Sequence, residues 1–89
     1  MNSKTTRDFR EQLAALPIAA RKQAQEAYRL FAAEPSHPGL HFKKVHDRPP
    51  IYSARIGIGY RALGVLKDDT IVWFWIGSHA DYDRLLNTL

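Results

Sequence analysis

A run of six apolar residues, from Ile71 to Ile76, constrains the fold more than any other feature of the sequence. The run is too short to cross a membrane, which takes about 20 apolar residues. It carries no polar residue on either face, so we expect a central β-strand that other elements cover on both sides. The run ends at Gly77, and His79 follows two residues later.

The first third of the chain predicts two helices. Thr5 or Thr6 is suited to cap the first helix. Leu16-Pro17 ends it, because the residue before a proline avoids the helical region. Residues 18–33 are rich in good helix formers and predict a second helix. Its apolar stripe consists mainly of alanines, which permit close packing on a neighbouring layer.

The remainder predicts strands joined by short turns, and short turns make neighbouring strands antiparallel. We expect the strands at residues 40–45, 51–56, 60–66 and 71–76, and a short C-terminal helix at 81–87 capped by Ser78 or Asp81. The prediction is one α+β domain spanning residues 1–89. An N-terminal helical hairpin packs on a four-stranded antiparallel sheet, and the short helix closes the chain.

The charge favours a polyanionic partner such as nucleic acid, since the formal net charge is +4 and the cations are unevenly placed. Residues 43–61 hold five cations and one acid. Simple solubility is the alternative, and edge lysines such as Lys43 and Lys44 also prevent strand addition. No secretory signal or membrane span is expected, and we expect a protein of the cytoplasm.

Arg55 and Arg61 flank the Gly57-Ile58-Gly59 turn, so a tight hairpin brings them close together. Two adjacent guanidinium groups repel each other unless an anion or a carboxylate lies between them. Arginine grips phosphate with two hydrogen bonds, which favours phosphate binding. Pairing with Asp81 or Asp83 is the structural alternative.

His79 is the candidate proton-transfer group, because imidazole titrates near neutrality and the residue follows a strand end. Capping of the last helix is its alternative role. Trp73 and Trp75 are expected on one face of the strand and Phe74 on the other, most simply as core residues.

Other site types find little support. The segment Gly57-Ile-Gly-Tyr-Arg-Ala62 matches a dinucleotide-binding fingerprint, but a strand follows it where a helix is required. His37, His41 and His46 are spread over a loop and a strand, which does not favour a metal site. The chain has no cysteine, which excludes disulfides and thiolate ligands. We expect no metal, cofactor or small-molecule ligand.

The order and spacing of these segments resemble the RelE/ParE superfamily of bacterial type II toxins over nearly the whole chain. The resemblance lies in the helical hairpin, the four-stranded sheet, the Lys43-Lys44 strand, the Gly59-Tyr60-Arg61 step and the segment from Ile76 to Leu86. It implies a toxin neutralised by a cognate antitoxin protein. RelE-like members cleave mRNA within the ribosome, whereas ParE-like members poison DNA gyrase.

The RelE-like resemblance is the closer one, and it implies an endoribonuclease that inhibits translation without a metal. Carried over residue by residue, it assigns catalytic roles to His79, Arg61, Lys44 and Tyr82. We further expect Lys43, Arg55 and Arg48 to bind RNA. A gyrase inhibitor without nuclease activity, or an inactive homologue that binds the antitoxin, remains the alternative.

Overall fold

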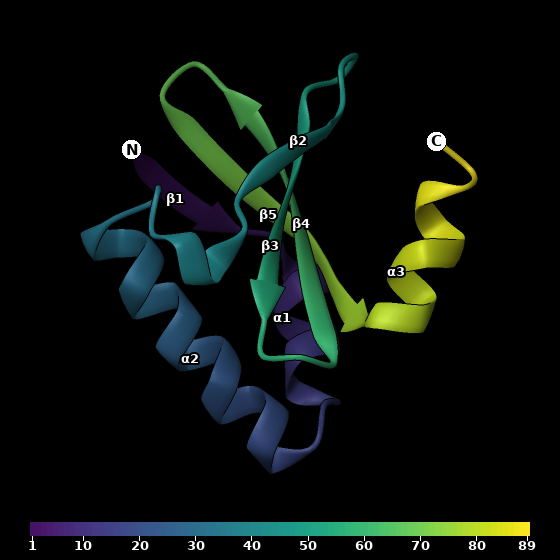
Figure 1. The fold of residues 1–89 in the computed structure, drawn as a ribbon. Helices are drawn as coiled ribbons and strands as arrows, with labels where there is room; N and C mark the ends of the chain where they lie inside the picture. Colours follow the sequence, from purple (N-terminus) through teal and green to yellow (C-terminus); the bar gives the residue numbers. More distant parts are fainter.

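The sheet is mixed, with five strands in the order β1-β5-β4-β3-β2 (Figure 1). The computed structural model describes all residues from 1 to 89. The strands are β1 (Asn2–Thr5), β2 (Lys43–His46), β3 (Ile51–Ile56), β4 (Tyr60–Lys67) and β5 (Thr70–Ser78). The helices are α1 (Arg7–Ala14), α2 (Ile18–Ala33) and α3 (His79–Leu86), with a short 3₁₀ helix, η1 (Pro38–Leu40). The predicted α+β class is confirmed.

Each face of the sheet has its own apolar cluster. The larger one joins α1 and α2 to the sheet through residues such as Phe9, Phe31 and Trp73. The smaller one joins α3 to the other face, with Ile51, Leu63 and Tyr82 at its centre. We call this second side the α3 face. Figure 1 shows α2 and α3 on opposite sides of the sheet.

The two N-terminal helices follow the prediction closely. Thr6 caps α1, and its hydroxyl accepts a hydrogen bond from the backbone N–H of Phe9 at 3.1 Å. The second helix runs from Ile18 to Ala33, and the small Ala20 and Ala24 are buried on its sheet side. No helix in the structure combines the length and the apolar character that a membrane crossing needs.

The predicted count of four antiparallel strands is wrong, because residues 2–5 form a fifth strand, β1, parallel to β5. The four residues Asn-Ser-Lys-Thr carry no apolar alternation, so no local pattern reveals them. Backbone hydrogen bonds hold them instead. The backbone N–H of Asn2 donates to the backbone oxygen of Asp69 at 2.8 Å, and the backbone N–H of Thr6 donates to the backbone oxygen of Trp73 at 2.9 Å.

The first predicted strand also begins too early. Residues Pro38–Leu40 form η1, and His41 adopts a left-handed conformation with φ of 45°. Leu40 is then only 1% exposed and anchors the connection in the larger cluster. The strand therefore starts at Lys43, where the chain reaches the edge of the sheet.

The expected common face of Trp73 and Trp75 is wrong, because a bulge interrupts the pairing of β4 with β5. Leu63 lies opposite Trp75, while the adjacent Gly64 lies opposite Trp73, so Phe74 is the extra residue. Trp73 consequently packs in the larger cluster, and Phe74 and Trp75 pack in the smaller one. One strand thereby supplies an indole to each core.

Helix α3 begins at His79, two residues before the predicted start. Ser78 is its N-cap, and its hydroxyl accepts a hydrogen bond from the backbone N–H of Asp81 at 3.1 Å. Arg84 donates to the Asp81 carboxylate. The Arg84 hydrogen bond, with a smaller contribution from Ser78, holds the pKa of Asp81 below its ordinary value of 3.8.

The lowered pKa of Asp81 can be measured directly. Replacing Arg84 by Ala should move the titration midpoint of Asp81 upward, toward 3.8. The carboxylate stabilises α3 above its unfolded-state pKa, and this contribution disappears as the pH falls through the lower folded-state value. Carboxyl-detected NMR titration of the wild type and of Arg84→Ala checks this. Arg29→Ala, which removes an exposed arginine paired with Glu26, should leave the midpoint unchanged.

The β3–β4 turn yields a stability prediction. Gly57 has φ of 59°, and a Cβ there would lie 2.6 Å from the Gln23 side chain on α2. Alanine at a left-handed position costs about 1–2 kcal/mol. Gly59 has open space around it. We expect Gly57→Ala to lower the unfolding free energy by about that amount and Gly59→Ala to change it by less than about 0.5 kcal/mol. Urea denaturation measures both, and equal effects would contradict this account of the turn.

Candidate functional site

The β3–β4 hairpin places Arg55 directly opposite Arg61. Side chains opposite each other in an antiparallel pair share a face, with Cβ atoms about 4.5–5.5 Å apart. The neighbouring residues Ala54, Ile56 and Ala62 lie in the larger cluster on the helical side. Because side chains alternate along a strand, both arginines lie on the α3 face.

The two guanidinium groups converge on one backbone carbonyl. Arg55 Nε donates to the Gly57 oxygen at 3.1 Å, and Arg61 Nη1 lies 3.5 Å from the same oxygen. Arg61 Nη1 also donates to the Tyr60 oxygen at 2.7 Å. Both side chains are half-buried. The turn therefore holds two cations side by side and orders their donor groups.

No carboxylate neutralises this arginine pair. None of the five ion pairs in the structure includes Arg55 or Arg61. The candidate acids are engaged elsewhere, since Asp81 accepts from Arg84 and Asp83 contacts His79. The predicted alternative of a structural pairing is not formed. Two adjacent guanidinium groups without a counter-charge make a favourable place for an anion, and phosphate fits their geometry.

The backbone of His79 lies beside the turn that carries this pair. Gly77 is opposite Arg61 in the β4–β5 ladder, and Ser78 is opposite Tyr60. The next residue, His79, donates its backbone N–H to the Gly59 oxygen at 2.8 Å. The start of α3 is therefore fastened to the turn that carries both arginines.

The rotation of α3 decides which way its side chains face. Its sheet-facing stripe consists of Tyr82, Leu85 and Leu86. Asp81 and Arg84 lie on one flank of that stripe, where they line a groove with Gln12 and Leu16 of the α1 segment. Residues four apart lie on the same side of a helix, so His79 and Asp83 share the opposite flank. That flank lies on the side of α3 away from the groove.

The lysines divide between the two faces of the sheet. Lys43 pairs with Ser53 and lies on the α3 face, in the row next to the arginine pair. Lys44 pairs with Tyr52 and lies on the opposite face, with Nζ 3.6 Å from an Asp47 carboxylate oxygen. The structure brings Lys43 to the arginines and separates Lys44 from them.

Two further predicted residues, Arg48 and Tyr82, are not part of the arginine pair's surroundings on the open surface. Arg48 occupies the β2–β3 turn, which lies at the opposite end of β3 from the arginine pair, about 17 Å along the strand. Tyr82 is only 6% exposed and belongs to the smaller cluster. Its ring meets His79 edge to face, with centroids 6.0 Å apart.

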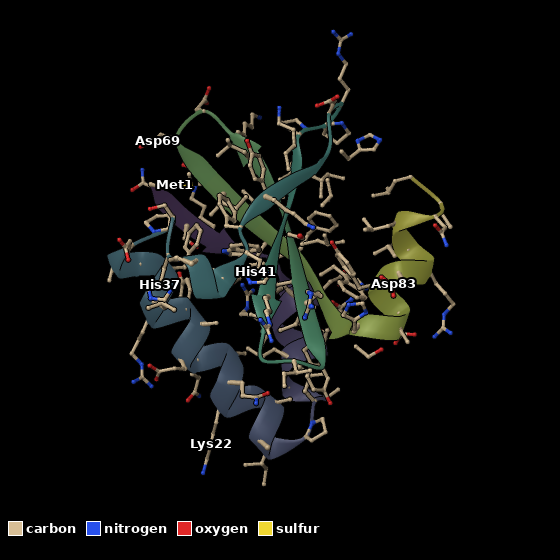
Figure 2. The ribbon with its side chains drawn as sticks, viewed as in Figure 1. Met1, Lys22, His37, His41, Asp69 and Asp83 are labelled. Carbon is tan, nitrogen blue, oxygen red and sulfur yellow. The ribbon has the colours of Figure 1, made fainter.

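Sequence reasoning missed one contact of this site. The Asp83 Oδ2 atom lies 3.0 Å from Nδ1 of His79. The i, i+4 spacing of the two residues could have indicated it, but the helix was expected to begin only at Asp81. Figure 2 labels Asp83 on α3.

The other histidines serve local roles. His37 Nδ1 accepts a hydrogen bond from the Gly39 N–H at 3.0 Å, and His46 Nδ1 lies 3.1 Å from the Pro49 oxygen. Figure 2 shows His37 well away from Asp83. No three side chains among His, Cys, Asp and Glu are arranged to hold a metal ion. The candidate site for an anionic ligand is therefore the α3-face cation set, which consists of Lys43, Arg55 and Arg61, with His79 at the start of the adjoining helix.

Comparison with solved structures shows what the fold is. A chain of the RelB-RelE antitoxin-toxin complex of Methanococcus jannaschii superposes with a TM-score of 0.72 and 22% identity, covering 91% of this chain and 96% of the other. A chain of the archaeal RelE-RelB complex of Pyrococcus horikoshii OT3 superposes with a TM-score of 0.69 and 21% identity, and the match covers 86% of this chain and 92% of the other. The isolated E. coli RelE toxin superposes with a TM-score of 0.65 and 14% identity, and the match covers 99% of this chain and 98% of the other. The fold is therefore that of RelE-like toxins.

Sequence comparison adds the family. No curated protein shows significant sequence similarity to the chain. The profile of the ParE-like toxin domain matches residues 19–84, which is more than half of the chain and includes every residue of the α3-face cation set. The chain therefore belongs to the ParE-like toxin domain family, within the RelE/ParE superfamily of toxins.

Proposed function

We propose that this protein is the toxin of a type II toxin–antitoxin system and that it cleaves mRNA on the ribosome, in the cytoplasm, without a metal. The observation that carries the nuclease proposal is the arginine pair Arg55–Arg61, which has no carboxylate partner and shares the α3 face with His79. A phosphate between two guanidinium groups, next to an imidazole, is the arrangement that phosphodiester transfer needs.

The chemistry proposed is attack of the RNA 2′-hydroxyl on the adjacent phosphorus. The imidazole of His79 accepts the hydroxyl proton, the 2′-oxygen bonds to phosphorus, and the bond from phosphorus to the 5′-oxygen breaks. The leaving 5′-oxygen takes a proton from water, and the hydroxide so formed takes the proton from the imidazolium, which restores neutral His79. Arg55 and Arg61 stabilise the additional negative charge on the phosphorane oxygens, which is the main contribution of fixed cations to such a step.

The remaining predicted residues differ in how directly this proposal involves them. Lys43 neutralises the RNA backbone next to the arginine pair, because it shares their face. Arg48 contacts nucleotides further along the strand, since it lies at the far end of the hairpin. Tyr82 supports the imidazole ring from the smaller cluster. A catalytic role for Lys44 stays a prediction, and its position on the opposite face does not favour it.

A cognate antitoxin completes the proposal. The two archaeal structures named above are antitoxin–toxin complexes, and we extend that association to this chain. With a formal net charge of +4, the chain favours an acidic or amphipathic segment that lies across the cation set or the helical hairpin.

The family match supports a second candidate function. The matched profile is that of the ParE-like toxin domain, and ParE-like toxins act on DNA gyrase. In that case the cations of the α3 face would bind an acidic surface of gyrase, and His79 would transfer no proton. The two functions differ in their cellular effect, since one cuts mRNA and the other induces the DNA-damage response.

Removing the proposed proton-transfer group or a phosphate ligand should abolish toxicity. Replacing His79 or Arg61 by Ala should each lower the cleavage rate by about 10²–10³-fold, because one stabilising group of the transition state is lost. Sequencing of RNA 5′ ends after brief induction measures cleavage, and growth after induction measures toxicity.

Matched variants test the specificity of these losses. His41→Asn replaces an exposed histidine at a left-handed position that asparagine tolerates, and Arg29→Ala removes an exposed arginine from α2. Both should cut mRNA as the wild type does. Undiminished cleavage by the His79 and Arg61 variants contradicts the site, and a DNA-damage response without new RNA ends favours the gyrase function.

The antitoxin proposal is tested by co-expression. A small acidic protein encoded beside this chain should restore growth and co-purify with it. Because attraction between a basic and an acidic surface is screened by salt, the association rate should fall as the salt concentration rises. Failure of every neighbouring small acidic protein to bind would contradict the proposal.

A further inference from the structure

His79 and Asp83 form a pair with a defined geometry. The Nδ1 atom of His79 lies 3.0 Å from Oδ2 of Asp83, which is hydrogen-bond distance. A carboxylate accepts but does not donate, so this contact favours the tautomer in which Nδ1 carries the hydrogen. In the neutral ring, Nε2 then carries the lone pair, and no protein group hydrogen bonds to it.

Asp83 has no competing partner. The nearest arginine along α3, Arg84, is engaged by Asp81, and Arg55 and Arg61 bond to backbone carbonyls. The pair also has the less favourable order for helix stability, because the basic residue precedes the acid by four positions. Stabilisation of the helix is therefore a poor explanation of this contact.

The ring is restrained on its other sides as well. The buried Tyr82 ring meets the imidazole edge to face, with centroids 6.0 Å apart. The backbone N–H of His79 donates a hydrogen bond to the Gly59 oxygen at 2.8 Å, within the turn between Arg55 and Arg61. Asp83 and Tyr82 thus contact the imidazole on two sides, and the backbone hydrogen bond to Gly59 fixes the start of the helix that carries it.

We propose that Asp83 is the positioning residue of His79, which it holds as the Nδ1–H tautomer so that Nε2 accepts the proton of the RNA 2′-hydroxyl. This inference rests on the nuclease function proposed above. Asp83 itself touches no substrate and exchanges no proton. It orients the ring and stabilises the imidazolium that forms when Nε2 takes the proton, as a carboxylate does for a catalytic histidine in general.

The tautomer can be measured without any RNA. Long-range ¹H–¹⁵N NMR of the ¹⁵N-labelled protein, at a pH where His79 is neutral, distinguishes a protonated from an unprotonated ring nitrogen. We expect Nδ1–H in the wild type and in Asp83→Glu, which keeps a carboxylate within reach. Asp83→Ala should lose the preference, and Asp81→Ala should keep it, because it removes an acid from the same helix without touching His79.

Cleavage of a synthetic mRNA on purified ribosomes tests the consequence. Asp83→Ala should lower kcat at least about tenfold, a part of the roughly 10²–10⁴-fold that a positioned proton-transfer group supplies. KM should stay near the wild-type value, because Asp83 makes no contact with RNA. Asp83→Glu should recover most of the rate, and Asp81→Ala should cleave as the wild type does. Circular dichroism confirms that each variant is folded.

The possible outcomes test the positioning role of Asp83 separately from the proposed nuclease function. An Nε2–H tautomer in the wild type overturns the role of Asp83, whatever the nuclease does. If Asp83→Ala loses the preference for the Nδ1–H tautomer but keeps the wild-type kcat, the positioning role of Asp83 is overturned as well. If the wild type cuts no RNA, the proposed function fails, while the tautomer measurement still decides whether Asp83 positions the ring.

Discussion

Strand β5 is the element on which the rest of the structure depends. It pairs with β1 along one edge and with β4 along the other. The bulge at Phe74 turns Trp73 into one core and Trp75 into the other. A single strand thus binds the N-terminal helices to one face of the sheet and α3 to the other. The same strand delivers the chain to His79 at its end.

The position of the candidate site follows from register. Because Arg55 lies opposite Arg61 and Gly77 lies opposite Arg61 on the other side, one cross-strand row holds both guanidinium groups next to the start of α3. A shift of one residue in either ladder would turn an arginine to the helical side. The turn glycine Gly57 contributes directly, since its carbonyl accepts from both side chains.

Several parts of the fold and site could be predicted from local pattern. The second helix and the β3 and β4 strands appear where expected, because each is set by a clear period or by prolines and glycines. The closeness of Arg55 to Arg61 was also predictable, since a short hairpin fixes it. Local pattern could not reveal β1, whose pairing with β5 comes from residues nearly 70 positions away.

The sequence alone determined the α+β class, the packing of the helical hairpin on one face of the sheet and the supply of cations between Lys43 and Arg61, because periodicity, turn residues and composition are local properties. Only the tertiary structure decided which of those cations act together. It placed Lys43 on the α3 face and Lys44 on the other, and it separated Trp73 from Trp75 by a bulge. It also brought Asp83 to His79, because the helix starts two residues earlier than its sequence suggests. Register, bulges and helix rotation depend on contacts between distant segments, and no local pattern encodes them.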